Sequence, residues 1–123
     1  MNSKHPMSIG ELKANLRRKP KDARVLYDFV YFHPAGVHSY RGYYDRPAIG
    51  YASNGDAPTV EAVLAMLDKL TSGVFTGYKG GEYSYQDDQP LYVANHSETG
   101  DTMIVDVFND DVHDVRLETA VFG

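Results

Sequence analysis

The sequence contains no cysteine and no long hydrophobic run. Without cysteine the chain has no disulfide and no thiolate metal site, which fits a reducing cytoplasm. No apolar stretch approaches the roughly 20 residues that a membrane-spanning helix needs. The first residues, MNSKHPMSIGELKANL, lack the apolar centre of a secretory signal peptide. We therefore expect a cytoplasmic protein with no membrane partner.

Signatures of catalysis and of metal binding are also missing. No serine lies in a G-x-S-x-G elbow, and no stretch matches the G-x-x-x-x-G-K-[ST] phosphate-binding loop. The closest histidine pair, His33 and His38, has no familiar ligand spacing. The acidic pairs at 87–88 and 110–111 lie in predicted turns, where carboxylates are usually just solvated. We expect no metal, no cofactor and no enzymatic activity. A small hydrolase or nuclease is the less favoured alternative.

Positive charge is scarce outside the first 24 residues. This basic arm has a net charge of +5, whereas the remaining residues sum to −10, which gives the −5 of the whole chain. Binding to nucleic acid depends on neutralising phosphates, so the acidic body argues against it. The arm is expected to solvate one end of the molecule, or to lie against the acidic body or a neighbouring subunit.

The pattern of the 123 residues predicts one α+β domain, with residues 1–24 as a basic N-terminal helix or arm and residues 25–123 as the body. Ser8 and Glu11 form a capping box that starts a helix over residues 8–16. Thr59 is a good N-cap for a second helix that runs to Leu70 and has an apolar stripe of period 3.6.

The remaining apolar segments predict a mainly antiparallel sheet of about five or six strands, with the two helices packed on it. The strongest strand is VLYDFVYF, in which only Asp28 is polar. This carboxylate is expected either to anchor Arg41 or a tyrosine hydroxyl of the neighbouring strand, or to lie at an exposed edge. Turn residues at 33–36 and 45–47 separate it from two further strands. The expected strands are 25–32, 37–44, 48–52, 91–95, 103–108 and 115–121.

Six of the ten tyrosines lie between Val25 and Ala52, together with Arg41 and Arg46. A phenol ring offers a flat apolar face with a hydroxyl, and a guanidinium stacks on rings and holds anions at two points. A second turn, with Lys79 before two glycines, offers an ammonium and exposed amides for an anion. The residues expected to bind a ligand are Tyr40, Arg41, Tyr43, Tyr44, Lys79, Gly80, Gly81 and Tyr83. The same tyrosines are equally suited to a subunit interface or to core packing.

After Arg24 the chain contains VLYDFVYFHPAGVHSYRGYYDRPAIGYA (residues 25–52), PTVEAVLAML (residues 58–67) and VFTGYKGGEYSYQDDQPLYVANH (residues 74–96). These segments, which cover most of this part of the chain, resemble a class of small phage and prophage proteins with YRGYY and GYKGGEY signatures. The resemblance implies a viral origin. By analogy with phage counter-defence proteins, we expect a homo-oligomeric sponge that sequesters a cyclic nucleotide or an ADP-ribose-type immune signal. The alternative is a protein–protein inhibitor of a host defence enzyme.

Overall fold

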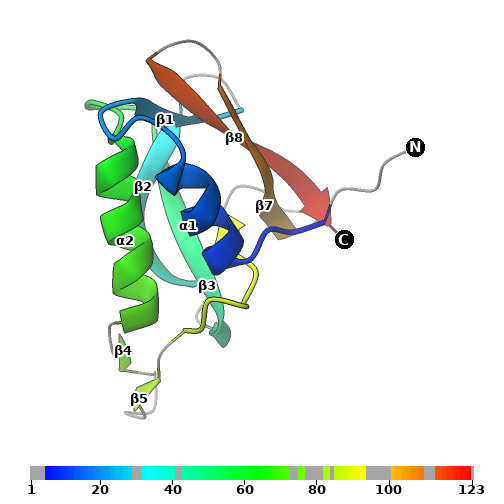
Figure 1. Ribbon diagram of the computed structural model, residues 1–123. Helices are drawn as coiled ribbons and strands as arrows, with labels where there is room; N and C mark the ends of the chain where they lie inside the picture. The colour runs from blue at the N-terminus through cyan, green and yellow to red at the C-terminus, as the bar shows by residue number, and fades with distance from the viewer. Residues whose placement is uncertain are drawn as a thin grey trace.

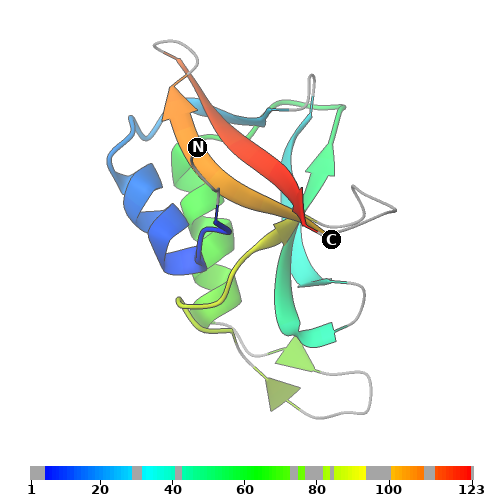
Figure 2. The ribbon, with the colours of Figure 1, turned by 90° about the vertical axis from the view of Figure 1, so that its right-hand side faces the viewer.

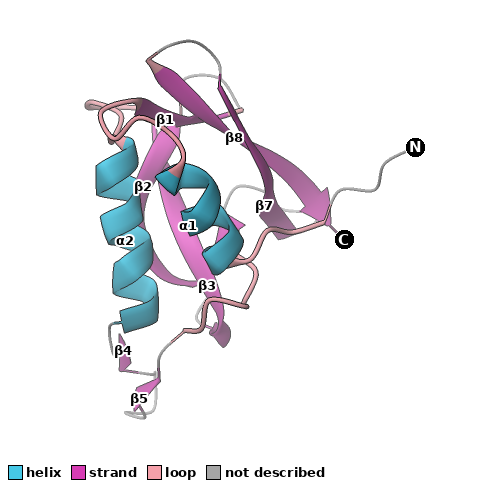
Figure 3. Ribbon diagram, in the orientation of Figure 1, coloured by secondary structure: helices cyan, strands magenta, loops and turns pink. Residues whose placement is uncertain are grey.

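The computed structural model contains two helices, a six-stranded sheet and a separate two-stranded hairpin (Figures 1 and 3). It describes residues 5–28, 32–40, 43–72, 75–76, 82–83, 85–93, 101–109 and 113–122, and the side chains among them except those of 38–40, 43–46, 75–76, 82–83 and 101. The elements are α1 (Ile9–Arg17), β1 (Arg24–Tyr27), β2 (His33–Tyr40), β3 (Tyr43–Ala52), α2 (Val60–Ser72), β4 (Phe75–Thr76), β5 (Glu82–Tyr83), β6 (Tyr92–Val93), β7 (Asp101–Asn109) and β8 (Asp114–Phe122).

Both helices begin where the sequence predicts. Glu11 N donates to the Ser8 hydroxyl at 3.1 Å and Ser8 N donates to the Glu11 carboxylate at 3.0 Å, so the capping box of α1 is complete. Thr59 caps α2 by accepting from Ala62 N at 3.1 Å. The apolar stripe of each helix is buried against the sheet and the other helix. The stripe consists of Ile9, Leu12 and Leu16 in α1 and of Val60, Val63, Leu67 and Leu70 in α2.

The large sheet is mixed, in the order β1-β8-β7-β6-β3-β2. The α+β class and the six strands are confirmed, and β6, β7 and β8 form the expected antiparallel meander. The expectation of a mainly antiparallel sheet is only partly right, because β1 is parallel to β8 and β3 is parallel to β6. Both parallel pairs join segments that are distant in the sequence, so local alternation of residues does not reveal them.

The predicted boundaries between residues 25 and 52 are wrong in two places. The segment 33–36, expected as a turn, lies in β2, where Gly36 has φ +72° and the register shifts between Pro34 and Val37. A bulge of this kind bends a strand without ending it. The segment 45–47, also expected as a turn, lies in β3. Proline has no backbone N–H to donate to a neighbouring strand, so it is found where strand pairing is irregular or absent. Pro47 meets this condition because its partner Ser39 adjoins a second register shift, between Ser39 and Tyr40, and because the pairing of β3 with β6 begins only at Ala48.

The sheet curls so that its two edge strands approach each other. Tyr27 N in β1 donates to Phe32 O, immediately before β2, at 3.0 Å. The Tyr27 hydroxyl reaches across the interior to Gly50 O in β3 at 2.8 Å. Both helices lie on one side of the curled sheet, α1 against β7 and α2 against β1 and β2 (Figures 1 and 2). One hydrophobic cluster contains residues of both helices and of five of the strands.

Candidate functional site

The tyrosine-rich stretch forms the hairpin of β2 and β3, with Tyr40 paired directly opposite Tyr43. Residues opposed in this way share one face of an antiparallel ladder. Tyr44, one position further along β3, belongs to the other face. Arg41 lies in the two-residue connection, outside the described residues, and the side chains of the three tyrosines are outside the description.

The second group of predicted residues belongs to the hairpin of β4 and β5. Tyr83 pairs with Phe75, and Glu82 pairs with Thr76. Lys79, Gly80 and Gly81 lie between the two strands, outside the described residues. Strands β4 and β5 are antiparallel, and the turn predicted between them lies outside the described residues.

The end of β2 and the start of β3 lie at the same end of the molecule as β4 and β5, near the C-terminal end of α2 (Figures 1 and 2). Strand β4 follows α2 almost at once, so the position of this helix fixes where the short hairpin begins. The fold thus brings the two segments with the predicted binding residues to one end, although more than thirty positions separate them in the sequence.

Other tyrosines of the same stretch have structural roles. Tyr27 is fully buried, and burial raises the pKa of its hydroxyl well above the ordinary value. Tyr51 contacts Phe32 edge to face, with the ring centroids 5.3 Å apart. Part of the density of tyrosine between residues 25 and 52 is therefore explained by packing, at Tyr27 and Tyr51.

Asp28 follows β1 and is exposed. Its carboxylate accepts hydrogen bonds from Thr119 N at 2.9 Å and from the Thr119 hydroxyl at 2.7 Å. Of the two sequence-based alternatives for this residue, the exposed position is the one observed. Its contacts tie the end of β1 to β8.

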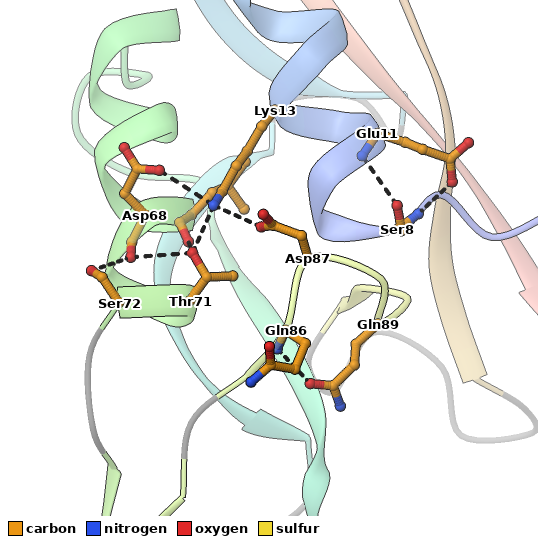
Figure 4. Close-up of polar contacts among 10 residues, drawn as sticks. Ser8, Glu11, Lys13, Asp68, Thr71, Ser72, Gln86, Asp87 and Gln89 are labelled. Atoms are coloured by element: carbon orange, nitrogen blue, oxygen red, sulfur yellow. Dashed lines mark hydrogen bonds and ion pairs between the residues drawn. The ribbon is translucent and has the colours of Figure 1, made fainter.

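Lys13 is a buried charged residue that the sequence-based prediction did not single out. The Lys13 ammonium donates to the Thr71 hydroxyl at 2.6 Å and to the Asp87 carboxylate at 2.9 Å, and it lies 3.3 Å from the Asp68 carboxylate (Figure 4). Its side chain is only 5% exposed, whereas those of Asp68 and Asp87 are 59% and 64% exposed. Lys13 lies four residues after Ile9, on the apolar face of α1. This position is the sequence feature that could have predicted a buried lysine. The cluster joins two helices and the segment before β6.

Of the two histidines His33 and His38, the structure describes the side chain of His33. His33 is buried, with Nδ1 3.2 Å from Pro34 O and Nε2 3.0 Å from Asn54 O, so backbone carbonyls face both ring nitrogens. The His38 side chain is outside the description. Among the described residues no group of three or more histidine, aspartate and glutamate side chains is arranged to hold a metal ion. Asp87 is the ion-pair partner of Lys13, and Asp110 and Asp111 lie outside the described residues.

No helix among the described residues is long and apolar enough to cross a bilayer. No protein-family model matches the chain, and no curated protein or solved structure is significantly similar to it.

Proposed function

We propose that the protein binds and sequesters a nucleotide-like anionic small molecule, without transforming it, at the end of the molecule that carries the β2–β3 and β4–β5 hairpins. The observation that carries the proposal is the arrangement of these two hairpins. One opposes Tyr40 to Tyr43, the other contains Tyr83, and both lie at the same end of the fold. Aromatic rings stack on nucleobases of any identity.

In this proposal Tyr40, Tyr43 and Tyr83 provide stacking surfaces for a base. Arg41 and Lys79 hold the phosphate, since guanidinium and ammonium groups are the usual partners of phosphate oxygens. Gly80 and Gly81 contribute backbone amides at a point where the absence of a Cβ allows close approach. The resemblance of the YRGYY and GYKGGEY segments to phage proteins supports a cyclic nucleotide or an ADP-ribose-type immune signal as the ligand.

Isothermal titration calorimetry against cyclic dinucleotides, cyclic trinucleotides and ADP-ribose derivatives tests the proposal. We expect saturable heat with at least one ligand, and mass spectrometry should recover that ligand unchanged after the complex is denatured. A ligand recovered in cleaved form would instead indicate a hydrolase.

The Arg41→Ala/Tyr43→Ala double variant should bind at least about tenfold more weakly, because it removes one charged and one stacking contact. Arg18→Ala is the matched control, since Arg18 is the exposed C-cap of α1 and loses the same charge away from the hairpins. Absence of heat with every ligand, or equal binding by the two variants, would contradict the proposal.

A further inference from the structure

A groove runs between α2 and the segment that follows α1. Its larger part has a volume of about 450 Å³ and is lined by Arg17, Lys21, Glu61, Leu64, Ala65 and Asp68. A second hollow of about 200 Å³ shares Lys21 and Glu61 and extends the groove to Asp22 and Thr59 at the start of α2. The hollow is therefore continuous along more than two turns of α2.

The two banks of the groove carry opposite charges. Arg17, at the end of α1, and Lys21, in the segment after it, form the basic bank, and Glu61 and Asp68 form the acidic bank on α2. Leu64 and Ala65 lie between the two acidic residues and provide the apolar floor. Ala65 is exposed, and its small side chain leaves room for another chain to come close.

Most of these charges have no ion-pair partner among the described residues. In the described residues no ion pair involves Arg17, Lys21 or Glu61, and only Asp68 is engaged, with Lys13 at 3.3 Å. Lys21 and Glu61 line the same hollow, and Glu61 N donates to Lys21 O at 3.1 Å, yet their charged groups do not meet across it. The charges therefore remain available to a partner.

We propose that this groove is a self-association surface, on which a second copy of the chain packs about a two-fold axis that runs along the groove. Such an axis places the basic bank of each copy over the acidic bank of the other copy. A two-fold interface uses the same patch on both subunits, so it requires a patch that complements itself. A strongly charged partner of one sign, such as nucleic acid, does not match a patch that carries both signs.

The pairing follows from the way the helices run. Lys13 contacts Thr71 near the end of α2, while Lys21 lies beside Glu61 near its start, so α1 and the segment after it run antiparallel to α2. The two-fold axis then sets Lys21 against Glu61 of the partner subunit, and Arg17 toward Asp68 of the partner subunit. The apolar floors of the two copies meet between these pairs.

Charge reversal tests this geometry by sedimentation velocity over a wide concentration range. The wild-type chain should form a dimer. The Arg17→Glu/Lys21→Glu variant makes both banks acidic, and Glu61→Lys adds positive charge to the acidic bank, so each variant alone should self-associate at least about tenfold more weakly. Mixing the two variants restores opposite charges in the contacts at 21 and 61 and should restore a dimer of one copy of each.

The matched control is Arg18→Glu/Lys69→Glu, which makes the same charge change at two exposed positions that do not line the groove. It should dimerise as the wild type does, and circular dichroism melting should show all variants folded. A monomeric wild type would assign the groove to another partner and overturn the proposal. A dimer that persists in both reversed variants, or a mixture that stays monomeric, would overturn it as well.

Discussion

At the scale of single residues, polar groups in the interior of this protein act mainly as connectors. Tyr27 fills the space inside the curled sheet, and its hydroxyl donates to Gly50 O. Buried phenols usually find such a partner, because an unpaired hydroxyl in the core costs free energy. The backbone carbonyls that face His33 serve the same purpose at the start of β2.

The raised pKa of Tyr27 predicts a specific loss of stability in alkali. Below pH about 10 the hydroxyl is protonated in both the folded and the unfolded chain. Above that pH the unfolded chain releases the proton and the folded chain holds it, so the free energy of unfolding falls as pH rises. The Tyr27→Phe variant lacks this titration, although it loses a hydrogen bond worth about 1 kcal/mol at neutral pH.

Urea denaturation of the two proteins from pH 7 to pH 11 measures the effect. The wild type should be the more stable at pH 7, and its advantage should shrink above pH about 10. The other titrating groups are common to both proteins, so they cancel in the difference. Stability curves that remain parallel across this range would contradict the assignment.

At the scale of elements, the helices depend on local sequence and on one cross-link. The capping residues Ser8 and Thr59 set the starts of α1 and α2, and their apolar stripes set which face is buried. Lys13 then fixes the two helices to each other and to the segment that precedes β6 (Figure 4). Gly10 adds a close approach, since its N–H donates to Asp87 O at 2.8 Å and a Cβ there would lie 3.2 Å from the same oxygen.

We predict that the Lys13→Met substitution lowers the free energy of unfolding by about 1–3 kcal/mol. Methionine retains much of the buried apolar stem and loses the contacts with Thr71, Asp68 and Asp87. The cost stays in this range because both carboxylates are more than half exposed and water can solvate them. Lys69→Met is the control, since Lys69 is exposed on α2 and should change stability by no more than about 0.5 kcal/mol. Equal effects in urea denaturation would show that Lys13 does not join the elements.

At the scale of the whole molecule, long-range strand pairing determines the shape. Arg24 and Asp114 pair at the start of the β1–β8 ladder and also form an ion pair at 2.9 Å. Asp28 and Thr119 close the other end of this ladder. Together they hold β1 in place at the edge of the sheet while its end turns toward β2.

The Asp28→Ala variant should be destabilised by about 1–2 kcal/mol, because it removes two hydrogen bonds that a carboxylate accepts from Thr119. Asp28→Asn keeps one acceptor oxygen and should lose less. Asp56→Ala, in an exposed loop, is the control for loss of charge. Thermal unfolding followed by circular dichroism gives the order of the three, and an Asp56→Ala loss as large as that of Asp28→Ala would contradict the prediction.

Features that depend on residues close together in the sequence were predicted correctly, whereas contacts between residues far apart in the sequence were missed. Capping residues and apolar stripes located both helices, and alternation located β6, β7 and β8. Pro34, Gly36 and Pro47 suggested turns, but Pro34 pairs with Tyr51, Pro47 pairs with Ser39, and Gly36 lies at a register shift inside β2. Lys13 was overlooked because its three partners lie far along the chain.

The parallel ladder between β1 and β8 has a consequence for biosynthesis. Arg24 and its partner Asp114 are 90 positions apart, so a ribosome must translate most of the chain before the first strand finds its neighbour. Until then the newly made β1 segment has an unsatisfied edge, a state in which nascent proteins aggregate or recruit chaperones. The contact order of this topology also favours slow refolding, whereas α1 and α2 are free to form early.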